Sequence, residues 1–352
     1  MRRLLLVLLA TVLAAGALEL LVRVLSPDPE NRPESYTLMW DPDPVLGYVT
    51  RPGLRICVAG NVPIHTNSLG LRNDEFPLQK PSGEIRILGV GDSVLWGACV
   101  RTEDTVLERL QHELTRSAAK PWRVINGAVV GYNTAQEAAW LEQRGMALDP
   151  DLVIVGYCLN DFWEPGDGIG TAERFERFYR MRSVLPLNTV TCKSLLYRFI
   201  NYRLTNGLFR ALSRSSRSAP TARPSEPDQP RVVEPMLEHA ADSPDAARMR
   251  AEVERSFARM RDLLAGRARL CVVIFPIKTQ VEASQPARPE QRFITGVLDR
   301  LSIPALDLLD AFRAQPGVPL FNDLWHLSGA GHRVAADALH AFLVERGLIT
   351  LR

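Results

Sequence analysis

The sequence predicts an α/β fold in which a parallel sheet is covered by helices on both faces. Two observations support this prediction. Short apolar segments of strand length recur along the chain, and segments with helical spacing of apolar residues lie between them. Strands and helices that alternate in this way form parallel sheets with helices on both faces. The five strands are expected at residues 85–90, 122–125, 151–155, 270–275 and 305–308.

Local signals also predict the main helices. Apolar residues recur at helical spacing over residues 104–114. The segment Thr134–Glu137 matches a capping box, in which the Thr134 hydroxyl and the Glu137 carboxylate would each satisfy a free amide of the helix that follows. Ser328 is expected to cap a last helix that runs to about Val344.

The amino terminus has the features of a membrane-targeting segment. Arg2 and Arg3 precede an apolar stretch over residues 4–25, which is about as long as a bilayer-spanning helix. The positive residues place the amino end in the cytoplasm and the rest of the chain outside that membrane. Glu19 and Arg23 lie four residues apart and could pair on one helical face. We therefore expect a transmembrane helix that anchors an extracytoplasmic protein.

Two alternatives for this segment remain open. Residues 15–17 form a small-residue site at which a signal peptide could be cleaved, and the protein would then be secreted. A buried core helix is the second alternative, which the prolines directly after the segment disfavour. The chain is divided into residues 1–26 as anchor or signal segment, 27–80 as spacer with a small β element, and 81–352 as the α/β domain.

A long insertion interrupts the α/β pattern at about residues 163–246. Its first part, residues 171–217, is rich in arginine with aromatic and aliphatic residues between the charges. A solvated helical insertion, a lid over the site and a basic amphipathic helix on an anionic membrane surface would all have this pattern. Residues 213–235 are rich in Ser, Pro and Arg, which predicts a flexible loop.

Composition excludes several kinds of function. The 42 basic and 40 acidic residues leave a net charge of +2, so a general nucleic-acid binder is not expected. The five cysteines are scattered and form no CxxC pair, which argues against a zinc site. The start of a dinucleotide-binding fingerprint at Gly89–Gly91 fails because Val94 stands where its third glycine is needed. Neither a metal nor an organic cofactor is expected.

The candidate catalytic residues lie where strands end. Gly91 and Asp92 lead from the first predicted strand to Ser93, and in parallel sheets ligands bind at the carboxyl ends of the strands. A serine becomes a nucleophile only when a base takes its proton, and an acid must orient that base. His326, three residues after Asp323, follows the last predicted strand. We predict a catalytic triad of Ser93, His326 and Asp323.

An acyl-transfer site also needs hydrogen-bond donors for the oxyanion. Gly127 follows the second predicted strand and could donate its backbone amide, and Asn160 follows the third and could donate its side-chain amide. Three consecutive strand ends and the carboxyl-terminal segment would then each supply one group of the same site.

This series of motifs resembles the four sequence blocks of the SGNH (GDSL) hydrolase family. The blocks are Gly91-Asp92-Ser93, Gly127, Asn160-Asp161 and Asp323-x-x-His326. The resemblance implies a flavodoxin-like three-layer α/β/α sandwich, acyl-ester chemistry without a cofactor, and an oxyanion hole formed by Ser93, Gly127 and Asn160. Gly47-Tyr48 and the segment 67–72 also resemble membrane-anchored bacterial members of the family, which implies a place at a bacterial inner membrane with the α/β domain in the periplasm. Cys158 stands where the third block usually has glycine.

Three functions agree with these residues. The first is an esterase, in which water releases the acyl group from Ser93. The second is an O-acyl transferase, in which a hydroxyl of a cell-surface polysaccharide accepts the acyl group. The third is a non-catalytic carbohydrate-binding or assembly protein with the same fold. The esterase is the preferred interpretation, with an acylated small molecule or polysaccharide as the substrate.

Overall fold

The computed structural model describes residues 2–25, 39–58, 62–117, 120–159, 194, 196–197, 200, 204, 244–282 and 289–350 of the 352-residue chain. The proline-rich spacer, Asn160, most of the basic insertion and the loop predicted at residues 213–235 lie outside these residues.

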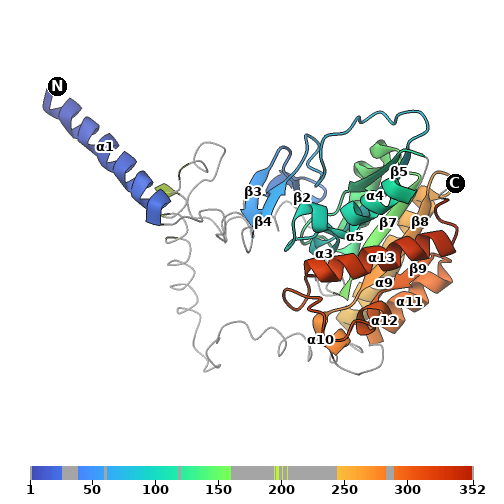
Figure 1. Ribbon diagram of the computed structural model, residues 1–352. Helices are drawn as coiled ribbons and strands as arrows, with labels where there is room; N and C mark the ends of the chain where they lie inside the picture. The colour runs from blue at the N-terminus through green and yellow to red at the C-terminus, as the bar shows by residue number, and fades with distance from the viewer. Residues whose placement is uncertain are drawn as a thin grey trace.

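A five-stranded parallel sheet forms the centre of the α/β body, as the sequence predicts (Figure 1). The strand order is β6-β5-β7-β8-β9, and every neighbouring pair is parallel. Numbered from the first strand of this sheet the order is 2-1-3-4-5, the flavodoxin-like order. The strands are β5 (Ile85–Gly91), β6 (Trp122–Asn126), β7 (Leu152–Cys158), β8 (Arg269–Phe275) and β9 (Ala305–Asp307).

Helices cover both faces of the sheet (Figure 1). One layer contains α4 (Val106–Ser117), α12 (Leu309–Arg313) and α13 (Gly329–Glu345). The opposite layer contains α5 (Thr134–Gln143), α9 (Pro244–Leu264) and α11 (Pro289–Arg300). Short helices lie in the connections: α3 (Ser93–Trp96), η1 (Thr102–Asp104), η2 (Gly145–Leu148) and α10 (Lys278–Glu282).

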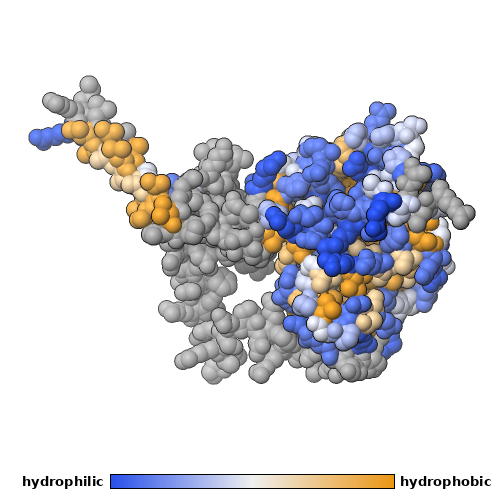
Figure 2. Space-filling view, in the orientation of Figure 1, coloured by the Kyte–Doolittle hydropathy of each residue, from blue (hydrophilic) through white to orange (hydrophobic). Residues whose placement is uncertain are grey.

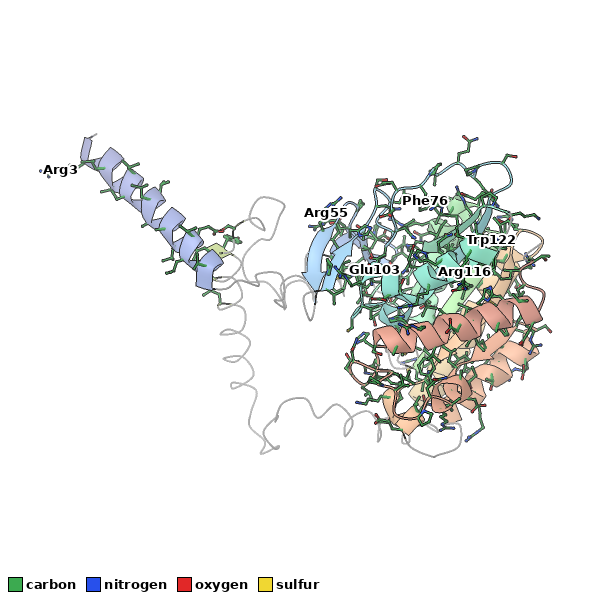
Figure 3. All side chains as sticks on the ribbon, viewed as in Figure 1. Arg3, Arg55, Phe76, Glu103, Arg116 and Trp122 are labelled. Carbon is green, nitrogen blue, oxygen red and sulfur yellow. The ribbon has the colours of Figure 1, made fainter. Side chains whose placement is uncertain are left out.

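The hydrophobic core is divided in two by the sheet. Because side chains alternate along a strand, Ile87 packs into the layer that contains α4, and Leu88 packs into the layer that contains α5. Every residue of β7 is buried, as expected for a central strand covered on both faces. Side chains fill the space between sheet and helices; Trp122 at the start of β6 is one of them (Figure 3).

The start of α5 differs from the predicted capping box. Asn133, not Thr134, is the N-cap: its side chain accepts from the Gln136 amide, and the Gln136 side chain reaches back to the Asn133 amide. Glu137 therefore does not cap the helix. It is fully buried, and neither of its carboxylate oxygens has a hydrogen-bond partner in the described structure.

Two small antiparallel hairpins precede the sheet, at the place where the sequence predicts a β element. They consist of β1 (Trp40–Asp43) with β2 (Gly47–Thr50), and β3 (Arg55–Val58) with β4 (Val62–His65). Tyr48 connects the first hairpin to the loop after β6: its hydroxyl donates to the Val130 carbonyl, and its carbonyl accepts from the Tyr132 hydroxyl. The hairpin thus supports a loop at the carboxyl edge of the sheet.

The amino-terminal helix α1 (Arg2–Leu25) stands apart from the α/β body (Figure 1). Leucine and valine side chains are exposed along it, and Figure 2 shows them as an apolar surface, which excludes a buried core helix. Glu19 accepts hydrogen bonds from the Ser194 hydroxyl and the Leu196 amide. None of the helices in the described residues combines the length and the apolar character needed to cross a membrane. The predicted transmembrane helix is therefore not confirmed.

Candidate active site

Ser93 lies at the carboxyl end of β5, next to the point where the strand order reverses. β5 ends at Gly91 and α3 begins at Ser93, with Asp92 as the N-cap between them. The Asp92 carboxylate is buried and accepts a hydrogen bond from the Val94 amide at 2.8 Å. A side chain at position 91 would collide with Leu95, so glycine is required for this tight turn. The Ser93 amide lies in the first turn of α3, where amides have no intrahelical acceptor.

A hydrogen-bonded chain joins the three predicted triad residues. The Ser93 Oγ lies 3.0 Å from His326 Nε2, and His326 Nδ1 lies 2.7 Å from Asp323 Oδ2. The other oxygen of Asp323 accepts from the backbone amides of Trp325 and His326 at 2.8 and 2.7 Å. The carboxylate is therefore held on both sides, and it fixes the plane of the imidazole ring.

The Asp323–His326 segment is a short, closed loop. Phe321 and Leu327 form a β-bridge, and the Asn322 amide donates to the His326 carbonyl at 2.8 Å. This loop follows β9 and α12 along the chain and ends at the Ser328 cap of α13, as predicted. The backbone thus presents the aspartate and the histidine on one rigid turn.

Gly127 does not have the role that the sequence predicted for it. Its backbone amide donates to the Gly89 carbonyl at 2.8 Å, within the pairing of β5 and β6, so it is not free to bind an oxyanion. Glycine is needed here for packing, because a Cβ atom would lie 2.4 Å from the Trp140 ring. Asn160, the other predicted donor, lies outside the described residues.

Most backbone amides of the loop after Gly127 donate to an acceptor. The Ala128 amide donates to the Asn126 side chain, and the Val129 amide donates to the Gly91 carbonyl beside Ser93. The Tyr132 amide donates to the Val129 carbonyl in the loop, and the Asn133 amide donates to the Gln136 side chain in α5. Among the described residues, the amides of Val130 and Gly131 are thus the two in this loop without an acceptor. Gly131 has a φ of +81°, a conformation that favours glycine.

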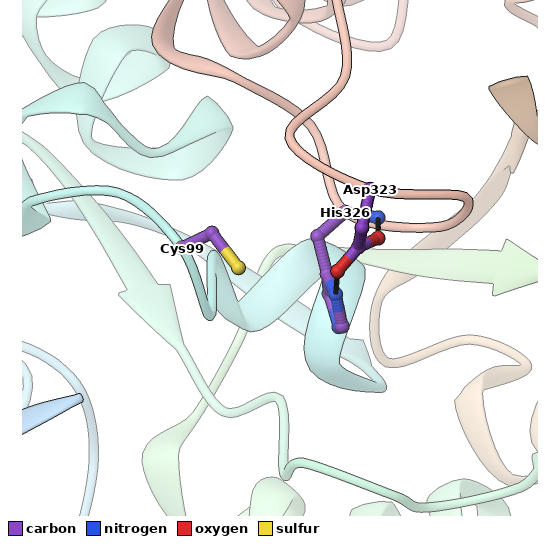
Figure 4. Close-up of side chains that lie close together, drawn as sticks. All are labelled: Cys99, Asp323 and His326. Carbon is purple, nitrogen blue, oxygen red and sulfur yellow. Dashed lines mark hydrogen bonds and ion pairs between the residues drawn. The ribbon is translucent and has the colours of Figure 1, made fainter. Parts of the chain in front are cut away.

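One residue near the triad was not predicted from the sequence. Cys99 lies in the loop between α3 and η1, and its thiol is within 4.8 Å of ligand atoms of both Asp323 and His326 (Figure 4). The cysteine is partly exposed and forms no disulfide. No sequence signal links it to the candidate triad, because it belongs to none of the four motif blocks and lies more than two hundred residues from His326.

The chain matches one protein family over most of its length. The sequence profile of the GDSL-like lipase/acylhydrolase family matches residues 90–334, a range that contains Ser93, Asp323 and His326. This chain belongs to that family. No curated protein matches the chain.

Several solved structures resemble this chain at low identity. LAE5, an alpha/beta hydrolase from the metagenome of Lake Arreo in Spain, is 16% identical, covering 73% of this chain and 94% of its own, with a TM-score of 0.42. A variant of Axe2, an acetyl xylan esterase from Geobacillus stearothermophilus, is 16% identical, with coverages of 76% and 97% and a TM-score of 0.42. TesA is 14% identical, with coverages of 73% and 97% and a TM-score of 0.40.

The pKa values of Asp323 and His326 are shifted in opposite directions. Burial raises the pKa of Asp323, but the hydrogen bonds from the His326 ring and from two backbone amides outweigh it and hold that pKa below 3.8. Burial lowers the pKa of His326, but the contacts with Asp323 and with the Cys99 thiol outweigh it and raise that pKa above 6.5. An ionised Asp323 therefore stabilises the imidazolium, the form that appears when a base has taken a proton.

A buried arginine in the acylhydrolase holds the loop that carries Cys99. The Arg72 guanidinium donates to the carbonyls of Trp96, Gly97 and Val100 at 2.5–2.7 Å, and it stacks on the Trp96 ring at 4.5 Å. Burial lowers the pKa of Arg72 to about 9. Three neutral carbonyls thus accept hydrogen bonds from one buried cation, and these bonds hold the segment directly after α3 in place.

Proposed function

We propose that this acylhydrolase is a serine-dependent esterase that cleaves carboxylic esters through an acyl-enzyme on Ser93. The observation that carries the proposal is the unbroken chain of hydrogen bonds from Ser93 through His326 to Asp323. A serine hydroxyl has little nucleophilicity until a base within hydrogen-bond reach takes its proton, and Nε2 of His326 is within that reach.

The reaction follows from this geometry. As the Ser93 oxygen attacks the ester carbonyl, its proton passes to His326 Nε2, and Asp323 stabilises the resulting imidazolium. His326 then gives the proton to the leaving alcohol, which departs and leaves an ester on Ser93. A water molecule that loses its proton to His326 attacks this ester, and the acid product and the free serine are formed.

The negative charge on the carbonyl oxygen needs amide donors. The Ser93 amide is one donor, because it lies in the first turn of α3 without an intrahelical acceptor. We place the second donor on the loop after β6, at Gly131, because the Val129 amide ties that loop to the strand end before Ser93. The side chain of Asn160 is the third donor, by its family resemblance.

We propose water as the acyl acceptor. In the described part of the chain, the side chains of His326 and Asp323 are 25% and 45% exposed, which supports access of water to the base. An acyl transferase has to exclude water from its acyl-enzyme, and an open base works against such exclusion. Acylated sugars or small O-acetyl esters are the substrates that we propose.

We further propose that α1 attaches the enzyme to a membrane, with the α/β domain on the extracytoplasmic side. The support is the row of exposed leucine and valine side chains on α1 (Figure 2) and the two arginines at its start. Fractionation of cells that express the full chain tests this, with deletion of residues 2–25 as the comparison. If the full chain and the truncated chain both remained in the soluble fraction, the attachment would be wrong.

Active-site labelling tests the proposed chemistry. The full chain is treated with a fluorophosphonate probe, and the modified peptide is located by mass spectrometry. We expect one adduct, on Ser93, which is lost in His326→Ala because the serine is no longer activated. A folded protein that hydrolyses no simple ester and forms no adduct would contradict the proposal and favour a binding protein that retains the fold.

A further inference from the structure

A cluster of three side chains next to Ser93 has the composition of a metal site. Cys99, His326 and Asp323 offer a thiolate sulfur, an imidazole nitrogen and a carboxylate oxygen, all within 4.8 Å of one another (Figure 4). These three donor types are the ones that bind Zn²⁺ in proteins. Cys99 and His326 are partly exposed and Asp323 is exposed, so an ion can enter from solvent.

The two loops that supply these ligands are held in place by hydrogen bonds. Arg72 fixes the backbone on both sides of Cys99 through the carbonyls of Gly97 and Val100. The Asn322 side chain donates to the Cys99 carbonyl at 3.4 Å and to the Leu327 carbonyl at 3.1 Å, so it links the cysteine loop to the triad loop. Ligands held in this way lose little freedom when an ion binds, and supports of this kind typically affect metal affinity about 10–100-fold.

We propose that Cys99, His326 and Asp323 form an inhibitory Zn²⁺ site that switches off the triad. The thiol of Cys99 releases its proton to solvent on binding, so the thiolate and the Asp323 carboxylate together neutralise the ion. Three protein ligands leave the fourth position of a tetrahedral Zn²⁺ site to water. Apart from the S–H bond of Cys99, no covalent bond of the protein is broken, and a chelator reverses the inhibition as the thiolate takes up a proton from solvent.

The inhibition follows from the roles of the two nitrogens of His326. Because Asp323 Oδ2 faces Nδ1 at 2.7 Å, an ion that also binds Asp323 has to bind Nδ1, in place of the hydrogen bond between the two side chains. The ring proton then stays on Nε2, so the nitrogen that faces Ser93 has no lone pair to accept the serine proton. This arrangement leaves Ser93 without a working base. The presence of the ion site does not depend on the proposed esterase activity; only its inhibitory consequence rests on that activity.

Cobalt binding tests the site without reference to activity. The metal-free full chain in detergent is titrated with Co²⁺, whose bond to a thiolate gives a charge-transfer band in the near ultraviolet. We expect the band to saturate at one equivalent, to be displaced by Zn²⁺, and to be absent in Cys99→Ala. A band of equal strength in Cys99→Ala would assign the ion to another cysteine and overturn the proposal, as would the lack of any band in the wild-type chain.

Inhibition is measured on the same proteins with p-nitrophenyl acetate, each variant relative to its own uninhibited rate. Cys99→Ala and Cys99→Ser should raise the Zn²⁺ concentration for half inhibition by at least about tenfold. His65→Ala is the matched control, because His65 and Asp74 form a similar pair at 3.0 Å on the surface; its inhibition should equal that of wild type. Equal inhibition of the Cys99 variants and wild type would contradict the proposal. If the protein bound Co²⁺ but hydrolysed no ester, the proposed ion site would be supported and the proposed esterase activity would be wrong.

Discussion

The Ser93 hydroxyl oxygen and His326 Nε2 lie 3.0 Å apart although 233 positions separate the two residues in the sequence. The parallel sheet accounts for this contact. Ser93 follows the carboxyl end of β5, and the loop that holds His326 follows β9 and α12, so both reach the same edge of the sheet. The contact turns an ordinary hydroxyl into a candidate nucleophile, and the first prediction tests it directly.

Replacement of any triad residue should abolish most of the activity. We expect Ser93→Ala, His326→Ala and Asp323→Asn each to lower kcat by about three orders of magnitude or more, because the members of a triad act as a unit. Steady-state hydrolysis of p-nitrophenyl acetate measures this, with circular dichroism to verify folding. His65→Ala is the control, since it removes a histidine that also pairs with an aspartate. A Ser93→Ala enzyme with wild-type kcat would exclude the mechanism.

The pH dependence should report the raised pKa of His326. The histidine must be neutral to accept the Ser93 proton, so kcat/KM should rise with pH through that pKa, at a pH above the usual 6.5. Because Cys99 helps to raise the pKa, Cys99→Ala should move this acid limb to lower pH. The profile is recorded with a chelator present, and His112→Ala, which changes an exposed histidine, should leave it in place. An unmoved limb in Cys99→Ala would show that the thiol does not influence the base.

Gly131 should tolerate a side chain less well than another glycine of the same conformation. Gly131 and Gly83 both have a φ of +81°, so alanine carries the same backbone strain at either position. At Gly131, however, the new Cβ would lie 2.8 Å from the Tyr48 hydroxyl, whereas at Gly83 no atom lies within 4 Å. We expect Gly131→Ala to lower kcat by about tenfold to a hundredfold, by displacing a proposed oxyanion donor. Gly83→Ala should keep kcat, and equal kcat in the two variants would remove Gly131 from the oxyanion hole.

The buried carboxyl of Glu137 should make the protein less stable as the pH rises. Burial and the nearby Asp92 raise the pKa of Glu137 well above 4.5, so the folded state keeps a proton that the unfolded state loses above pH 4.5. The free energy of unfolding should therefore fall with pH, by up to about 1.4 kcal/mol per pH unit. Glu137→Gln removes this loss, so its advantage over wild type should be larger at pH 7 than at pH 5.

Denaturant unfolding at the two pH values measures this advantage. Glu142→Gln is the matched control on the same helix, because Glu142 is exposed and forms an ion pair with Arg259. It should show no gain that grows with pH. If the advantage of Glu137→Gln were the same at pH 5 and pH 7, the carboxyl would have to be ionised in the folded protein.

The sequence by itself determined the five strands and their parallel arrangement, and it predicted a site at which Ser93, Asp323 and His326 meet, as they do in the structure. These features depend on local patterns, since a run of apolar residues marks a buried strand and short motifs at strand ends mark catalytic positions. The Ser328 cap of α13 is of the same kind, because one hydroxyl and one amide three residues away decide it.

Only the tertiary structure decided which amides are free and which side chains meet. Gly127 follows a strand just as a donor would, but the pairing of β5 with β6 uses its amide. The pairs Asn133–Gln136 and Thr134–Glu137 both have the spacing of a capping box, but only the first caps α5, because packing in the interior buries the Glu137 carboxyl. Cys99 meets His326 because two loops distant in sequence are tied together through Asn322. Such contacts depend on register and packing between distant segments, which no local pattern encodes.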